Sequence, residues 1–114
     1  MMKHVHYTDV KAEDVDVEGA KEAKIRWLIT KKDGAKNFTM RLFDVEPGGC
    51  TPLHQHDWEH EVFIVSGCGE LRDKEQKDAF KQGDVIFVPA MEWHQFVNTG
   101  GELLQFICVI PYRN

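Results

Sequence analysis

Two stretches, PLHQHDWEHEVFIV at residues 52–65 and PAMEWHQFV at residues 89–97, hold four of the six histidines of this 114-residue chain. Both stretches are rich in aromatic and β-branched residues, which is typical of β-strands. In an extended segment, residues two apart point to the same face. His54 and His56 are therefore expected to direct their imidazoles toward one point.

The other two histidines of these stretches also fit an inward direction. His60 shares a strand face with Val62 and Ile64, so it points into the core if they do. His94 opens a later strand. A single histidine is often half-buried and hydrogen-bonded to a neighbour, but four imidazoles in an apolar interior would leave several polar groups unsatisfied without a metal ion. The predicted ligands of one divalent metal ion are His54, His56, His60 and His94.

The rest of the chain continues the strand pattern. Short apolar runs alternate with turn signals such as DG, EPGG, SGCG and NTGGE, whereas no window of helical length keeps an apolar face. About eight strands at this spacing predict an all-β sandwich or barrel. The clearest strand segments are IRWLI (25–29), FTMRLFDV (38–45), EVFIV (61–65), DVIFVP (84–89) and LLQFICVI (103–110).

The composition changes near residue 24, and this sets the expected boundaries. Residues 24–111 are predicted to form the barrel, residues 112–114 a short tail, and residues 1–23 an extended arm rich in charged residues. Such an arm can cross to a second subunit and add a strand to its sheet. We therefore expect a homodimer.

The spacing of the first histidine group matches a known motif. Gly48, His54, His56, His60 and Gly67 fit the pattern G-x5-H-x-H-x3-(E)-x6-G of the cupin superfamily. His60 stands where the family usually has glutamate. A slipped alignment would make Glu61 the ligand instead, but strand alternation places Glu61 on the opposite face from His60.

The second cupin motif, G-x5-P-x-G-x2-H-x3-N, matches at Gly83, Pro89, His94 and Asn98. Met91 replaces its middle glycine, so the turn after Pro89 is expected to use a conformation open to a side chain. With both motifs in order, the chain resembles the cupin superfamily. The resemblance implies a single-domain cupin jelly-roll β-barrel.

Histidine at the carboxylate position narrows the resemblance to small single-domain, manganese-type cupins with a four-histidine metal site. It implies Mn²⁺, with Fe²⁺, Cu²⁺, Ni²⁺ and Zn²⁺ as alternatives, since imidazole binds all of them. Four neutral ligands leave the full charge on the metal ion, which favours oxygen ligands and Lewis-acid chemistry.

Open positions on such a metal favour a metal-dependent oxygenase-type enzyme, with a small oxygen-bearing or unsaturated organic molecule as its substrate. The alternatives are a metal-assisted isomerase or lyase, and a non-catalytic cupin that binds a metal or a small ligand. The predicted pocket-lining residues, for several of which plain core packing is the competing interpretation, are Phe96, Phe106, Cys108, Met40, Leu42 and Ile110.

Charge and composition exclude other classes. A net charge of −5 without a basic stripe disfavours nucleic acid as a partner. No apolar run approaches the roughly 20 residues that span a bilayer, and the N-terminus lacks the apolar region of a secretory signal. Three widely spaced cysteines indicate reduced thiols rather than a disulfide framework. We therefore expect a cytoplasmic protein with no membrane partner.

Overall fold

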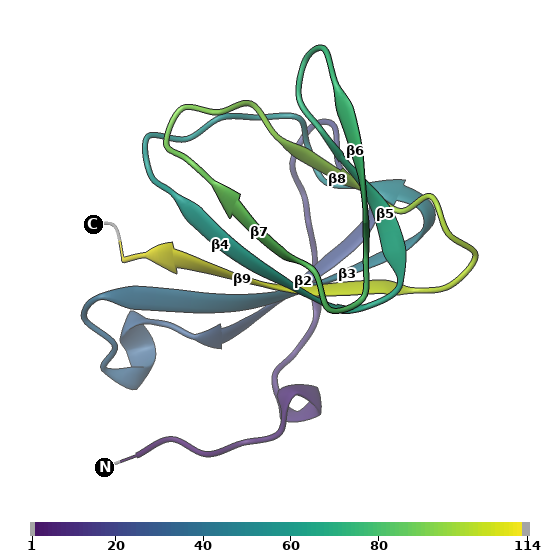
Figure 1. Ribbon diagram of the computed structural model, residues 1–114. Helices are drawn as coiled ribbons and strands as arrows, with labels where there is room; N and C mark the ends of the chain where they lie inside the picture. Colours follow the sequence, from purple (N-terminus) through teal and green to yellow (C-terminus); the bar gives the residue numbers. More distant parts are fainter. Residues whose placement is uncertain (1, 113–114) are drawn as a thin grey trace.

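The computed structural model describes residues 2–112 and confirms the predicted all-β class. Nine strands and two single-turn 3-10 helices, η1 (Tyr7–Asp9) and η2 (Lys31–Asp33), make up its regular structure, with no α-helix in the described residues (Figure 1). The strands are β1 (Glu13–Asp14), β2 (Lys21–Ile29), β3 (Phe38–Cys50), β4 (His60–Ser66), β5 (Cys68–Arg72), β6 (Lys77–Lys81), β7 (Val85–Val88), β8 (Gln95–Val97) and β9 (Leu104–Pro111).

All pairings are antiparallel and join the strands into one curled sheet. The strand order is β6-β5-β8-β3-β9-β4-β7, with β2 added to β3 and β1 to β2. The 13-residue strand β3 is the centre of this arrangement, because it pairs with β2, β8 and β9. The sheet curls around one interior (Figure 1).

Strand alternation fills that interior with aromatic and aliphatic side chains. Phe106 on β9 is 1% exposed, and its ring lies 5.0 Å from that of Phe43 and 4.6 Å from that of Phe96. Val62 and Ile64 on β4 are buried with them. Because these five residues come from four strands, their packing ties the curled sheet together.

The N-terminal segment lies over the outer face of its own sheet. Lys3 Nζ donates a hydrogen bond to the carbonyl of Leu28, and Arg26 Nε donates to the carbonyl of Val10. Farther along, β1 pairs with β2 of the same chain. The predicted homodimer is a separate matter and stays a prediction. Of the predicted tail 112–114, only Tyr112 falls among the described residues.

The two motif turns use left-handed backbone in different ways. Gly67 has φ of 88°, and a Cβ there would approach the carbonyl oxygen of Leu103 to 2.8 Å, so the motif needs glycine. Met91 has φ of 70°. The expectation that Met91 adopts a conformation open to side chains is therefore wrong. Its amide donates to the carbonyl of His56 at 2.6 Å, which holds the strained turn against the histidine segment.

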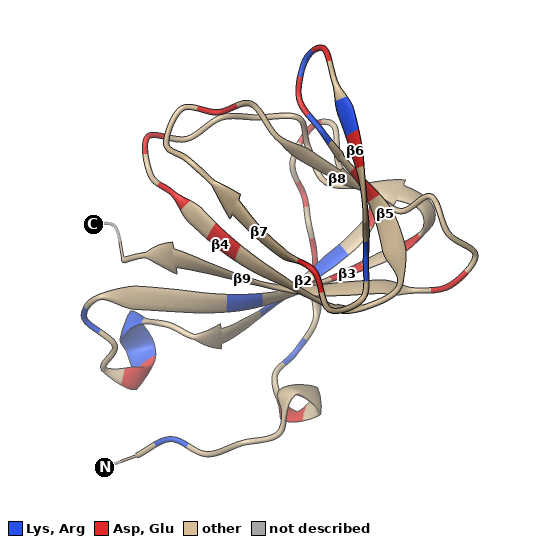
Figure 2. Cartoon of the chain, in the orientation of Figure 1, with Lys and Arg blue, Asp and Glu red and all other residues tan. Residues whose placement is uncertain are grey.

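Charged residues of both signs are spread over the outside of the sheet. Figure 2 shows Lys and Arg interspersed with Asp and Glu, most densely on the β5–β6 hairpin. The three cysteines, Cys50, Cys68 and Cys108, are all unpaired. Within residues 2–112, no helix has the length and apolar character needed to cross a membrane.

Candidate metal centre

Two antiparallel segments bring the histidines together. His54 lies between β3 and β4, and its amide and carbonyl exchange hydrogen bonds with those of His94 at 3.1 and 2.9 Å. This isolated bridge fixes the two motifs against each other just before β8 begins. His60 is the first residue of β4 and is 3% exposed, whereas Glu61 beside it is exposed.

The four imidazole rings form a compact cluster. The centre of the His54 ring lies 4.3 Å from that of His56 and 4.6 Å from that of His94. His60 lies 4.6 Å from His94 and 5.4 Å from His56. On its outer side, His56 stacks on Trp58 with ring centres 4.3 Å apart and planes 8° apart. The structure thus places all four sequence-predicted histidines side by side.

The second ring nitrogens have unequal surroundings. His94 Nδ1 lies 2.9 Å from the carbonyl oxygen of Glu92, so a backbone carbonyl rather than a carboxylate orients this ring. His60 Nδ1 is buried and has no hydrogen-bond partner among the described residues. An unpartnered buried nitrogen of this kind costs free energy unless something binds it.

Burial keeps the imidazoles neutral. Desolvation, together with smaller contributions from the neighbouring histidines and Arg41, lowers the pKa of His54 to about 4 and that of His60 to about 3. The pKa values of His56 and His94 are also lowered, again chiefly by burial. Near pH 7 all four rings are therefore uncharged, which is the form that binds a metal ion.

The donor set fits a divalent transition metal in kind, because four neutral imidazoles sit together and one buried nitrogen lacks a partner. The imidazole nitrogens do not converge on one common position. Among residues 2–112, no three His, Cys, Asp or Glu side chains are positioned as a ready-made metal site.

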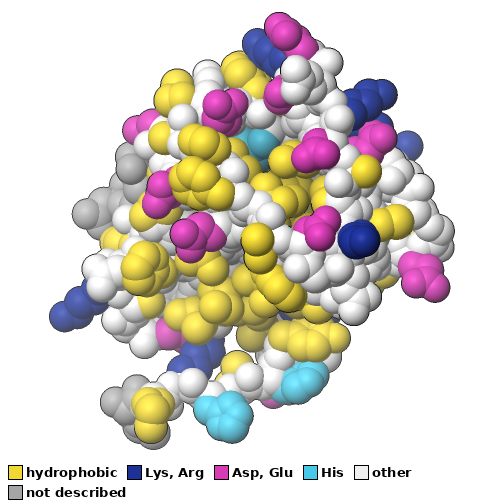
Figure 3. Space-filling model, viewed as in Figure 1, with side chains coloured by type: hydrophobic (Ala, Val, Ile, Leu, Met, Phe, Trp, Pro, Cys, Tyr) yellow, Lys and Arg dark blue, Asp and Glu magenta, His cyan; other side chains and the backbone are white. Residues whose placement is uncertain are grey.

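The histidines lie at one side of a cavity of about 460 Å³. Phe96, Phe106, Cys108 and Ile110, four of the six predicted pocket residues, line it. Residues 13–17, around β1, form part of its rim. In Figure 3 a histidine is visible at the bottom of a recess bordered by hydrophobic and acidic side chains.

Met40 and Leu42, the other two predicted pocket residues, lie on the opposite face of β3. Met40 instead lines a separate cavity together with residues of the N-terminal segment. The cavity beside the histidines is lined by the residues that alternate with Met40 and Leu42, namely Arg41 and Phe43. The prediction was wrong because β3 is apolar on both faces. Its outer face is covered by the arm, and its inner face holds a charged residue.

Sequence reasoning also missed Trp27 on β2, which lines the cavity together with Trp58. One available signal was the position of Arg41 in the apolar run FTMRLFDV, where it shares a face with Phe43 and Val45. The inward direction of a charged residue in a core strand is a mark of a binding site.

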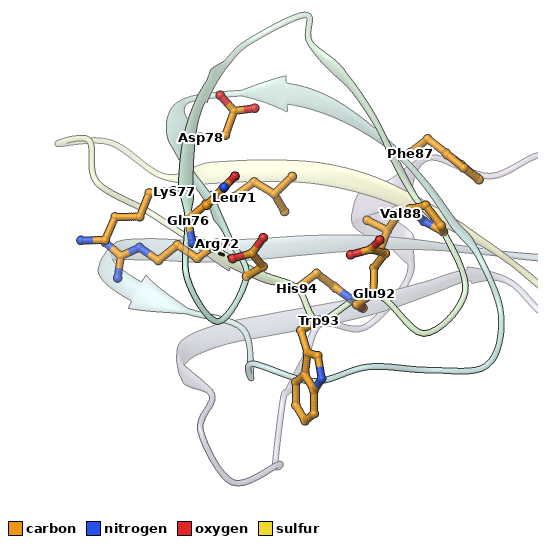
Figure 4. Close-up of a pocket in the computed structure, with 12 residues that line it drawn as sticks. Leu71, Arg72, Gln76, Lys77, Asp78, Phe87, Val88, Glu92, Trp93 and His94 are labelled. Carbon is orange, nitrogen blue, oxygen red and sulfur yellow. Dashed lines mark hydrogen bonds between the residues drawn. The ribbon is translucent and has the colours of Figure 1, made fainter.

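A smaller cavity of about 160 Å³ lies on the other side of His94. Figure 4 shows the side chains of Trp93 and His94 pointing in different directions, with Glu92 and Val88 on the side away from Trp93. Lys74 Nζ lies 3.9 Å from the centre of the Trp93 ring. Charged and amide side chains from the β5–β6 hairpin border much of this cavity, so it differs in character from the apolar cavity beside the histidines.

A solved structure of similar sequence covers almost the whole chain. The polyketide cyclase RemF from Streptomyces resistomycificus is 43% identical and superposes with a TM-score of 0.93, over 99% of this chain and 81% of that one. The shared fold therefore extends to the N-terminal segment and the cavity rim.

Two curated proteins match over shorter stretches. The oxalate-binding protein of Thermotoga maritima is 34% identical over 96 residues, which is 81% of this chain and 78% of that protein. The 1-methylthio-D-xylulose 5-phosphate methylsulfurylase of Rhodospirillum rubrum is 34% identical over 71 residues, or 62% of this chain. This chain spans only 46% of the length of that protein.

The family assignment rests on the barrel strands themselves. Residues 41–110, from within β3 to within β9, match the Cupin domain family. This range includes both histidine motifs, the buried aromatic cluster and most of the cavity. The sequence motifs, the curled antiparallel sheet and the family match agree, and the chain belongs to the cupin family.

Proposed function

We propose that this cupin is a metal-dependent enzyme that transforms a small oxygen-bearing organic molecule. One observation carries the proposal: four neutral imidazoles, one with an unpartnered buried nitrogen, adjoin an apolar cavity of about 460 Å³. A cavity of this size accepts a drug-sized or smaller ligand. The proposed metal ligands are His54, His56, His60 and His94, and Mn²⁺ remains the first choice among divalent ions.

When bound, such a metal ion supplies Lewis acidity toward carbonyl and enolate oxygens. The chain's own residues supply the remaining functions. The carbonyl of Glu92 orients His94, and Phe43, Phe96 and Phe106 form a wall that excludes water from the reacting molecule. An apolar wall of this kind also favours a compact, folded conformation of a flexible substrate.

The reaction class that we favour is a non-redox cyclisation or related lyase-type step on a carbonyl compound. Its support is the 43% identity to a polyketide cyclase over 99% of this chain, a range that includes every cavity residue. The oxygenase-type activity expected from the open metal site is the second candidate. The two classes differ in their need for dioxygen.

The test measures metal content and turnover together. The purified protein, with each candidate metal added in turn, is incubated with poly-β-ketone, diketone and catechol substrates, with and without dioxygen. We expect about one metal ion per chain and substrate loss that persists under anaerobic conditions. Loss only in the presence of dioxygen would establish the oxygenase instead, and no turnover with any metal would contradict both.

Matched variants connect the activity to the cluster. We expect His60→Ala to lower metal affinity by at least about 100-fold, since it removes a ligand. His4→Ala is the control, because His4 is an exposed histidine of the N-terminal segment. Equal metal content in the two variants would show that the cluster does not bind the metal.

A further inference from the structure

Arg41 is the one charged side chain from the central strands that lines the cavity beside the histidines. It lies on β3, directly across from Trp27 on β2 and Cys108 on β9, so these three residues form a row on the inner face of the sheet. His60 belongs to the neighbouring row, because Val62, two residues later on β4, pairs with Cys108.

The hydrogen bonding of Arg41 is incomplete. Its Nη2 donates to Cys108 Sγ at 2.9 Å, and sulfur is a weak acceptor. Its Nε is buried without a partner. Among the described residues, Arg41 forms no ion pair. The carboxylates at the cavity rim, Glu13, Asp14 and Asp16, are exposed to solvent.

Aromatic rings hold the guanidinium in place. Its central carbon lies 5.1 Å from the ring centre of Phe43 and 5.8 Å from that of Trp27. Such contacts fix the orientation of a guanidinium, but they do not use the N–H donors that lie in the plane of the guanidinium itself. Arginine stays charged at all physiological pH values. The side chain is therefore a positioned cation with donors available inside an apolar cavity.

We infer that Arg41 binds an anionic oxygen group of the cavity's ligand, so that the substrate class is an apolar, flat organic anion bearing a carboxylate or enolate. This inference rests on the proposed function. The anionic end lies at Arg41, the hydrocarbon body lies along Phe43 and Phe106, and a second oxygen function reaches the histidine cluster. A carboxylate also supplies the planar acceptor pair that matches a guanidinium.

The same placement has an electrostatic reason. A metal cation at the histidines and the guanidinium in the neighbouring row repel each other, and an anion between them relieves this repulsion. The positive charge of Arg41 already contributes to lowering the pKa values of all four histidines, so it lies within electrostatic reach of the cluster.

The test compares two probes of the same shape, 2-naphthoate and its neutral counterpart 2-naphthamide. Binding is measured by calorimetry on the full chain, first after metal removal with EDTA and then with Mn²⁺ added. In the metal-free protein we expect naphthoate to bind about tenfold or more tightly than naphthamide, as a charge-assisted hydrogen bond implies.

Variants assign this preference to one residue. Arg41→Met is expected to abolish the preference, and Arg41→Lys to retain part of it, since lysine keeps the charge but lacks the planar fork. Lys24→Met removes the same charge from the exposed side of β2 and is expected to leave the preference unchanged. Thermal unfolding of each variant establishes that it is folded.

Each result separates the two proposals. A preference that is absent from the metal-free protein, or that survives Arg41→Met, overturns the role of Arg41 while leaving the metal enzyme standing. Failure of both probes to bind overturns it as well. An Arg41-dependent preference in a protein that binds no metal supports the anion site and contradicts the proposed function.

Discussion

The inner and outer faces of β3 carry two arginine environments that differ in one respect. On the outer face, Arg26 Nη1 of neighbouring β2 pairs with Asp44 Oδ2 at 2.7 Å, and Gln105 donates to the other oxygen of Asp44 at 2.9 Å. On the inner face, Arg41 donates to a thiol and lies near two aromatic rings. Polar groups whose hydrogen bonds are made within the chain stabilise the fold, whereas a charged group with unpaired donors inside a cavity can bind a ligand.

The largest expected effect is a loss of unfolding free energy when the aromatic cluster on the inner face of the sheet loses a ring. Phe106→Ala removes a ring that is 1% exposed and packed between two phenylalanines, which should cost about 3–5 kcal/mol of unfolding free energy. Met40→Ala, on the partly covered outer face, should cost no more than about 2 kcal/mol. Urea denaturation of both variants measures the difference, and equal losses would contradict the assignment of the core to the inner face.

A second effect depends on pH and is confined to the inner face. Burial, with smaller contributions from Arg41 and the neighbouring histidines, lowers the pKa of His60 from its ordinary value of 6.5 to about 3, so the folded state disfavours protonation. Stability is then complete above pH 6.5 and falls as the pH decreases toward 3. The loss by pH 5 is at most about 2 kcal/mol for this histidine.

Chelator-treated protein provides the measurement, since a bound metal ion would add its own pH dependence. His60→Gln should make the stability profile less steep between pH 6.5 and 5, because one of the four imidazoles with a lowered pKa is gone. His4→Gln in the exposed N-terminal segment is the control and should leave the profile unchanged. An unchanged profile in His60→Gln would show that this burial does not destabilise the protonated ring.

The smallest effect compares the two arginines directly. Arg26→Met leaves Asp44 without its cation and should cost about 1–2 kcal/mol. Arg41→Met removes an unpaired charge from an apolar setting and should cost nothing or stabilise the free protein slightly. Chemical denaturation distinguishes the two variants, and an equal cost would mean that Arg41 serves the fold as Arg26 does.

The barrel was predictable from sequence because each element repeats the same signal. Alternation in EVFIV and LLQFICVI places Val62, Ile64 and Phe106 inside, and turn glycines mark the ends of the strands. The position of the histidines was predictable for the same reason. His60 follows the parity of Val62, and the bridge between His54 and His94 joins two motifs that were both visible in the sequence.

The cavity was less predictable because alternation fails where both faces of a strand are covered. Met40 and Leu42 satisfy an outer face under the arm, so their apolar character says nothing about the interior. Arg41 has the opposite ambiguity, since a lone arginine in a strand is usually exposed. Met91 shows a third case. Its left-handed backbone depends on a tertiary hydrogen bond to His56 that no local sequence rule contains.

The short strand β1 lies at the rim of the cavity, where substitutions can change which ligands the cavity accepts. It pairs with β2 through Glu13 with Ile25 and Asp14 with Lys24, and the amide of Val15 donates to the carbonyl of Ala23. Residues 13–17 form part of the cavity rim. Substitutions of the exposed residues Glu13, Asp14 and Asp16 alter what a ligand meets on entry, and they leave in place Val15, which packs against the core. In a scaffold whose interior positions are each tied to a neighbour, this rim is where new ligand preferences can arise at the lowest cost in stability.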